Sequence, residues 1–243
     1  MICLIPARSG SERIPGKNIK ELAGHPLIAY TISVALQSGC FDNVILSTDS
    51  PEIASIGQKY GAKVPFLRPS EWADGAHTLE WLKWTIDQLP GDDFCILYPT
   101  NPFRRVETVK EAVKAFVLPY TSLISMSKVK EHPEKTWFSM KMGDDTAFPM
   151  AIPYIGQMIT LLAGGKKVYN SPTQNLWPCY AQHANLRMTR RSTLEQYQNE
   201  TGAIICPFNV EFPESFDLNT PEDWQYAEFL IEKGLVKLPE VQI

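Results

Sequence analysis

Strand-length apolar runs alternate with longer amphipathic segments along the first half of the chain. The apolar runs predict buried strands at residues 2–5, 44–47, 92–98 and 122–127. The segments between them carry apolar residues at helical spacing and predict helices at 26–38, 51–60, 78–89 and 106–116. Repeated strand–loop–helix units are typical of an α/β fold with a mainly parallel sheet, which binds ligands at the carboxyl ends of its strands.

The pattern changes after residue 127. Residues 128–169 mix aromatic residues and methionines with prolines and glycines, and neither a helical nor a strand period persists there. Strand-like segments return at 180–187 and 202–207. A last helix is predicted at 221–233, because it starts with a proline and follows Thr220, a good N-cap residue.

The length of 243 residues suits one large α/β domain. With 44% hydrophobic and 21% charged residues, the composition fits a globular protein that has a substantial core. We therefore predict a single domain over residues 1–243 that contains an irregular, β-rich lobe at about 128–185. The apolar residues of this lobe are consistent with either a second small core or an oligomer face.

Charge and hydropathy exclude some classes of function. The net charge of −4 argues against a general nucleic-acid binder, whose affinity would depend on a basic face. No apolar run reaches the roughly 18 residues of a membrane span, and the N-terminus enters a strand directly, without the features of a signal peptide. We therefore expect a cytoplasmic protein with neither a nucleic-acid partner nor a membrane segment.

The cysteines are scattered and odd in number, and they form no CxxC pair. Their positions are Cys3, Cys40, Cys95, Cys179 and Cys206. This spacing favours free thiols in a reducing compartment over a zinc site or a disulfide framework.

The first predicted strand leads into a loop of small residues and cations. Its candidate ligand-binding residues are Ala7, Arg8, Ser9, Gly10, Ser11, Lys17 and Asn18. Small residues let a backbone approach phosphate closely, while an arginine can bind two oxygens and a lysine supplies a compact charge. A surface turn would have a similar composition, so both interpretations stay open. The loop is neither a P-loop nor GxGxxG, which disfavours an NAD-binding protein.

Asp217 and Asn219 precede the last predicted helix. Side chains two residues apart on extended backbone point to the same side, so this carboxylate and amide are candidate ligands for Mg²⁺. The alternative is that both residues only shape the turn before the helix.

Residues 6–19, which read PARSGSERIPGKNI, resemble the signature of the sugar-activating cytidylyltransferases, above all the acylneuraminate cytidylyltransferases. Further similar segments are STD at 47–49, FLRP at 66–69 and TPED at 220–223, and the resemblance extends from about residue 2 to 228. The family more often has Gly where Ser9 stands. The resemblance implies a Rossmann-like, GT-A-like nucleotidyltransferase fold with a small dimerisation-type lobe, and hence a homodimer.

The resemblance also implies roles for individual residues. Arg8 and Lys17 would neutralise the triphosphate as catalytic residues. Arg68 and His77 would join the first loop in binding nucleotide. The acceptor would contact Tyr98, Thr100, Arg104, Gln174 and Arg187. Asp217 matches the first metal-binding aspartate of the family, and Asn219 replaces the second.

The implied reaction is the Mg²⁺-dependent transfer of CMP from CTP to a small acidic sugar, a sialic acid-like nonulosonate, with release of pyrophosphate. Several positions depart from the family pattern, namely Tyr98 for Gln, Thr173 for Arg, Asn219 for Asp, and the segment with His183 for NGAIY. Two alternatives therefore stay open. In the first alternative, the acceptor is another ulosonate or a sugar phosphate. In the second, the chain is a nucleotide-binding module that has lost catalysis.

Overall fold

The computed structural model describes residues 1–69, 78–140, 150–153 and 172–242. The chain divides into two compact units, of which the first comprises residues 1–126 and 182–243 and the second Ser127–Ala181. The lobe expected at 128–185 overlaps this second unit. Within the described part of the chain, no helix is both long and apolar enough to cross a membrane.

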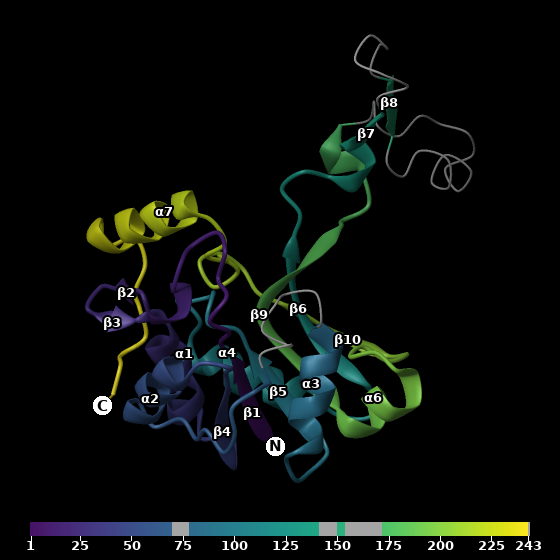
Figure 1. The fold of residues 1–243 in the computed structure, drawn as a ribbon. Coiled ribbons are helices and arrows are strands. Elements are labelled where there is room, and N and C mark those ends of the chain that lie inside the picture. The colour runs from purple at the N-terminus through teal and green to yellow at the C-terminus, as the bar shows by residue number, and fades with distance from the viewer. Residues whose placement is uncertain (70–77, 141–149, 154–171, 243) are drawn as a thin grey trace. The chain divides into compact units, whose positions relative to one another are not determined.

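The first unit is built on a six-stranded sheet (Figure 1). Its strands, in spatial order, are β10 (Ile205–Asn209), β6 (Ser122–Lys128), β9 (Tyr180–Arg190), β5 (Asp93–Leu97), β1 (Ile2–Pro6) and β4 (Asn43–Ser47). β1 pairs in parallel with both β4 and β5, and β10 pairs in parallel with β6. β9 runs antiparallel to β5. The mainly parallel α/β sheet expected from the sequence is therefore confirmed, and β9 is the antiparallel strand inserted in it.

The helices that cover the two faces of this sheet are α1 (Leu27–Ser38), α2 (Pro51–Lys59), α3 (Thr78–Asp87), α4 (Val106–Ala115) and α6 (Arg191–Tyr197). A further helix, α7 (Pro221–Glu232), packs against α1 instead. Apart from α6, which the sequence did not predict, each lies within a few residues of its predicted range. A short 3₁₀ helix, η1 (Lys17–Ile19), and the strand pair β2 (Glu21–Leu22) and β3 (His25–Pro26) connect β1 to α1.

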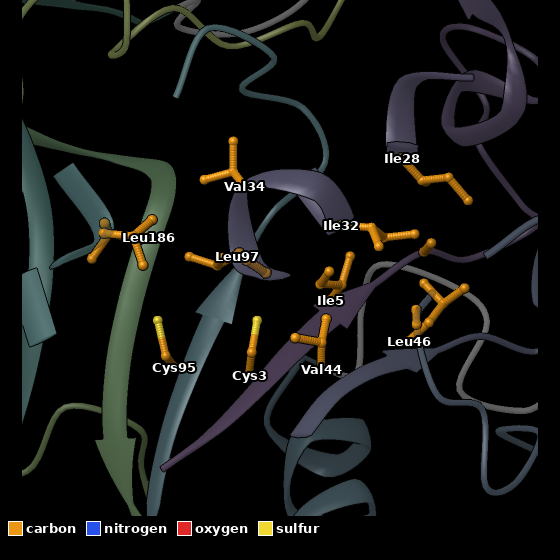
Figure 2. Close-up of a cluster of buried hydrophobic side chains, with 14 of the residues drawn as sticks. Cys3, Ile5, Ile28, Ile32, Val34, Val44, Leu46, Cys95, Leu97 and Leu186 are labelled. Atoms are coloured by element: carbon orange, nitrogen blue, oxygen red, sulfur yellow. The ribbon is translucent and has the colours of Figure 1, made fainter. Parts of the chain in front are cut away.

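Two apolar clusters flank the central strands, because these strands are buried on both faces. Figure 2 shows the first cluster, where Cys3 and Ile5 of β1 and Val44 of β4 lie below Ile32 and Val34 of α1. α2 and α4 contribute to this same cluster. On the other face, residues of β1 and β5 pack against α3 and α6.

A third cluster joins the two ends of the first unit. Leu27 and Tyr30 of α1 pack with Trp224 and Leu230 of α7, and Leu218 is fully buried among them. A capping box between Thr220 and Asp223 begins α7, as the sequence predicted for Thr220. The segment just before α7 is therefore held against the chain's N-terminal region.

The second unit contains the antiparallel strands β7 (Trp137–Met140) and β8 (Met150–Pro153) and the 3₁₀ helices η3 (Pro133–Lys135) and η5 (Thr173–Asn175). His132 is buried there, and its Nε2 lies 2.8 Å from the carbonyl oxygen of Trp177.

Candidate active site

A cavity of about 280 Å³ opens where β1 and β5 end. Its described lining comprises Pro6, Arg8, Ser11, Glu12, Arg13, Ile14, Lys17, Asn18, Tyr98, Pro99 and Thr100. The loop after β1 and the turn after β5 are neighbours because these strands pair in parallel, so their carboxyl ends meet at one edge. The cavity brings together four predicted nucleotide-binding residues and two predicted acceptor-binding residues, Tyr98 and Thr100.

Lys17 connects this cavity to a segment 200 residues further along the chain. It begins η1 after Gly16, whose φ of +61° is a left-handed conformation that glycine adopts without strain. Its Nζ donates a hydrogen bond of 2.8 Å to the carbonyl oxygen of Leu218. Burial lowers the pKa of Lys17, and the neighbouring Asp217 carboxylate opposes that shift.

Asp217, which lies near Lys17, has one carboxylate oxygen without a hydrogen-bond partner among the described residues. Its Oδ2 accepts a hydrogen bond of 2.8 Å from Asn219 Nδ2, whereas its Oδ1 is buried and has no hydrogen-bond partner among the described residues. A buried carboxylate oxygen without a partner is costly in water-free surroundings and suits a cation. Asn219 Oδ1 accepts from Arg13 Nη2 at 3.4 Å, so in this arrangement Asn219 orients Asp217.

Backbone contacts fix the Asp217 segment against the end of β5. Leu218 N donates to the carbonyl oxygen of Thr100 at 2.8 Å, and Asn101 Nδ2 donates to that of Phe216 at 2.8 Å. The described residues contain no group of three or more His, Cys, Asp or Glu side chains that could hold a metal ion. A metal held here would therefore keep most of its ligands as water or substrate oxygens, which is the usual habit of Mg²⁺.

The peptide group between Arg8 and Ser9 is held at both ends. Asn18 Nδ2 donates to Arg8 O at 3.0 Å, and Ser9 N donates to Asp49 Oδ1 at 2.9 Å. Ser9 Oγ also donates to Asp49 Oδ2. Arg68, which is buried, pairs with Asp49 Oδ1 at 3.8 Å.

Not every residue of the first loop faces the cavity. Ala7 is fully buried and its N–H donates to Ser47 O at 3.0 Å, while Ser9 and Gly10 are exposed on the loop. None of these three is among the described residues that line the cavity. Arg13, in contrast, lines the cavity and was not predicted, although it lies inside the recognised motif.

Arg104 lies inside the fold. It is 1% exposed, and its guanidinium donates to Asn185 Oδ1 at 3.0 Å, Thr31 Oγ1 at 3.3 Å and Tyr98 O at 2.8 Å, as well as to Asn185 O. Burial lowers its pKa to about 10. These contacts favour a structural role and disfavour the predicted contact with the acceptor.

Arg187, another predicted acceptor residue, is not among the described residues that line the cavity. Arg187 of β9 forms an ion pair with Glu200. Gln174 belongs to η5 of the second unit, and its side chain is exposed there. His77 lies outside the described residues. The next arginines along the chain donate to backbone oxygens: Arg190 donates to Tyr120 O, and Arg191 donates to Ile86 O and Leu89 O.

His183 is a further polar group near this end of the sheet. Its Nδ1 accepts from Asn185 N at 3.4 Å, and its Nε2 is buried without a hydrogen-bond partner among the described residues. Burial lowers the pKa of His183, which favours the neutral imidazole. The sequence marked this position only as a departure from the family pattern.

A larger cavity, of about 710 Å³, lies at the start of α4 and along residues 208–214 and 235–240. Of the predicted site residues, only Arg104 lines it, and its lining holds more carboxylates than cations. Because a triphosphate requires cations, the smaller cavity is the better candidate despite its size.

Comparison with known proteins identifies the family of the chain. A protein-family model described as cytidylyltransferase matches residues 2–126. The chain is 33% identical over 238 residues to a CMP-N,N'-diacetyllegionaminic acid synthase of Legionella pneumophila, with 96% of each chain covered. It is 30% identical over 239 residues to a pseudaminic acid cytidylyltransferase of Campylobacter jejuni, covering 94% of this chain and 95% of the relative.

A solved structure of a CMP:2-keto-3-deoxy-manno-octonic acid synthetase complexed with CTP has the same fold. The TM-score is 0.68 at 17% sequence identity, and the match covers 96% of this chain and 98% of the other. Because so low an identity shows the fold alone, this likeness supports the architecture and assigns no substrate.

Proposed function

Because the chain belongs to the cytidylyltransferase family, we propose that it transfers CMP from CTP to an acidic, sialic acid-like nonulosonate and releases pyrophosphate. The membership confirms the family expected from the sequence. The single observation that carries the proposal is the cavity where Arg8, Lys17 and Asn18 lie beside Tyr98 and Thr100. It provides cations for a triphosphate on one side and polar groups for a second substrate on the other.

In the proposed reaction an acceptor hydroxyl loses its proton to water and its oxygen bonds to the α-phosphorus of CTP, and the bond from that phosphorus to the pyrophosphate oxygen breaks. Negative charge grows on the phosphate oxygens during this step. Arg8 and Lys17 would neutralise that charge, and Arg13 adds a third cation on the cavity wall. Lys17 is held by Leu218 O before substrate arrives, so little reorganisation is needed during the reaction.

We propose Mg²⁺ as the cofactor, held through Asp217. The support is the buried Oδ1 of Asp217, which lacks a partner among the described residues. When bound, such an ion would draw electron density from the phosphate oxygens. Asn219 would serve mainly to orient Asp217, because its Nδ2 already donates to that carboxylate.

The direct test is pyrophosphate release from purified protein. The protein is incubated with CTP, Mg²⁺ and a panel of acceptors: N-acetylneuraminic, legionaminic and pseudaminic acids, 2-keto-3-deoxy-manno-octonic acid and a sugar phosphate. We expect release with CTP and one or more nine-carbon acids, little with ATP or GTP, and loss of release with EDTA that is restored by added Mg²⁺. Folded protein that releases pyrophosphate with none of these acceptors would contradict the proposal.

Lys17 offers a variant with a matched control. Lys17→Ala should lower kcat/KM by about 100-fold or more, since a preorganised cation next to developing charge contributes several kcal/mol. Lys20→Ala removes a lysine three residues away whose Nζ lies 4.2 Å from the Trp224 ring centroid and does not line the described cavity. The kcat/KM of Lys20→Ala should stay within about twofold of the wild type, because the exposed Lys20 side chain contacts the Trp224 ring and not the cavity.

The second candidate is a nucleotide-binding module without catalysis, and the observation that favours it is the amide of Asn219 at a metal position. Calorimetry would then detect CTP binding in a protein that releases no pyrophosphate. Asn219→Asp would restore release if the missing carboxylate were the cause.

We also propose that two copies associate through the second unit. Trp177 of that unit is 85% exposed and Tyr180 is 50% exposed, which is an unusual exposure for large apolar side chains. Analytical ultracentrifugation should find a dimer, and Trp177→Ser should weaken it. A monomer at micromolar concentration would contradict this assembly.

A further inference from the structure

Asp49 lies beside the nucleotide-binding loop at the carboxyl end of the sheet. The parallel pairing of β1 and β4 places Pro6 opposite Ser47, so the chain leaves both strands at the same edge. Ser9 follows β1 by three residues, and Asp49 follows β4 by two. Both carboxylate oxygens of Asp49 accept hydrogen bonds from Ser9, one from N at 2.9 Å and one from Oγ.

These bonds fix one peptide plane. The carbonyl oxygen of Arg8 and the N–H of Ser9 belong to the same planar group, so they point in opposite directions. Asn18 Nδ2 binds that oxygen at 3.0 Å, and Asp49 binds that N–H. Rotation of the plane would break both contacts, so the direction in which the Arg8 side chain leaves the backbone is determined.

Asp49 also contacts Arg68, a residue that the sequence predicts to bind nucleotide. Its side chain is 7% exposed and that of Arg68 is 3% exposed, and Arg68 Nη2 lies 3.8 Å from Asp49 Oδ1. Arg68 N additionally donates to Thr48 O at 2.8 Å. Within the described chain, Asp49 is the carboxylate paired with this buried guanidinium, and a buried cation that lost its counter-charge would be costly.

Neither Ser9 nor Asp49 is among the described residues that line the cavity, whereas Arg8 is. Both hydrogen-bond donors of Ser9 are used by Asp49, so in this geometry Ser9 offers no donor to a phosphate. Ser9 and Asp49 therefore hold the loop that carries Arg8 without lining the cavity themselves.

We propose that Asp49 is a positioning residue for nucleotide binding: its carboxylate holds the Arg8–Ser9 peptide through Ser9 and so sets Arg8 for the triphosphate end of CTP, while the pair with buried Arg68 keeps that carboxylate in place. The inference rests on the proposed function for the identity of the nucleotide. It adds a residue to that site which does not itself contact substrate.

The experiment uses the full chain with Asp49→Asn, Ser9→Ala and both together. Asp49→Asn should raise the KM for CTP by about 10-fold or more, because hydrogen bonds to charged groups exceed neutral ones by roughly the 1.4 kcal/mol that corresponds to tenfold. The KM for the acceptor should change by less than about threefold, because the acceptor does not contact the Arg8–Ser9 peptide. The kcat should fall as well, because Arg8 also neutralises the charge that grows on the phosphate oxygens during the reaction. Ser9→Ala keeps the Arg68 pair intact and should raise the KM for CTP by about threefold.

The double variant should not raise the KM for CTP beyond that of Asp49→Asn alone, because the effects of two residues in one hydrogen-bonded contact are not additive.

Asp42→Asn is the matched control. Asp42 is an exposed carboxylate at the opposite end of β4, where it pairs with the N-terminal amine at 2.7 Å. Its substitution should leave the KM for CTP within about twofold, as expected for a surface ion pair.

Hydrogen–deuterium exchange separates this inference from the proposed function. The Ser9 amide should exchange faster in Asp49→Asn and at the wild-type rate in Asp42→Asn. If the wild type never turns over CTP, the proposed function fails and the exchange rate alone decides whether Asp49 holds the loop. Unchanged exchange, an unchanged KM for CTP in Asp49→Asn, or full additivity in the double variant would each overturn the inference.

Discussion

Individual arginines have different roles in this protein. Arg8 and Arg13 line the cavity, whereas Arg104 lies in the interior and donates to Asn185, Thr31 and Tyr98 O. A buried guanidinium keeps its charge only when its N–H groups are satisfied, and here the fold supplies the acceptors. Arg104 therefore joins the end of β5 to β9 and α1.

Arg104→Gln tests this structural role. The shorter amide leaves several buried acceptors without a donor, so we expect the free energy of unfolding to fall by about 3 kcal/mol or more in urea titrations. Lys63→Gln is the control for loss of an exposed cation, because the Lys63 side chain is exposed and its Nζ donates to Asn43 Oδ1 at 2.6 Å. It should cost less than about 1 kcal/mol. A stable Arg104→Gln protein with a raised KM for the acceptor would contradict the structural role and support the predicted contact between Arg104 and the acceptor.

At the scale of elements, the close approach of α2 to β4 depends on one glycine. A Cβ on Gly57 would lie 2.1 Å from Leu46 Cδ2, and Leu46 is fully buried in the first cluster. A helix interior normally favours alanine over glycine by about 1 kcal/mol, so this position opposes the local preference. Packing against the sheet, and not helix propensity, selects the residue.

Gly57→Ala should therefore destabilise the protein. We expect a loss of about 1–3 kcal/mol in the free energy of unfolding, because overpacking forces side chains from their preferred rotamers. Ser55→Ala, at an exposed position of the same helix, should be neutral or slightly stabilising. If Gly57→Ala gained stability as Ser55→Ala does, α2 would not pack on Leu46 as described.

At the scale of the whole molecule, the centre of the sheet buries two thiols completely. Cys3 of β1 and Cys95 of β5 are partners in the strand register, and both side chains are 0% exposed. All five cysteines are free, as the sequence predicted. Burial raises the pKa of Cys95 to about 12, since an apolar core disfavours the thiolate.

This burial predicts a stability that falls at alkaline pH. A thiol whose pKa is raised in the folded state stabilises fully below its unfolded pKa of about 8.5, and the contribution disappears as pH rises towards 12. Between pH 9 and 10 the unfolded chain holds fewer protons than the native one, so each buried thiol lowers the unfolding free energy by about 1 kcal/mol.

Urea titrations at pH 8, 9 and 10 measure this slope. Cys95→Ala should show a decline that is smaller than that of the wild type by about 1 kcal/mol between pH 9 and 10. Cys40→Ala, at a partly exposed cysteine, is the control for loss of a thiol as such. Equal slopes in Cys95→Ala and the wild type would contradict the burial of Cys95.

Much of the site was predictable because its residues are clustered in the sequence. Arg8, Ser11, Lys17 and Asn18 share one loop, and the motif that contains them also contains Arg13. Asp49 was missed as a site residue, although its STD segment was recognised. Its role depends on a register between two strands, which no local pattern specifies.

The sequence by itself determined most strands and helices of the first unit, though not α6 or the short pair β2 and β3, and it determined the cytidylyltransferase family. These follow from apolar periodicity and from short motifs, whose physical causes act over a few residues. Only the tertiary structure decided which arginines face the cavity, that β9 runs antiparallel to β5, and that Lys17 meets Leu218. Those outcomes depend on the desolvation of charges and on the packing of distant segments, which are properties of the assembled core.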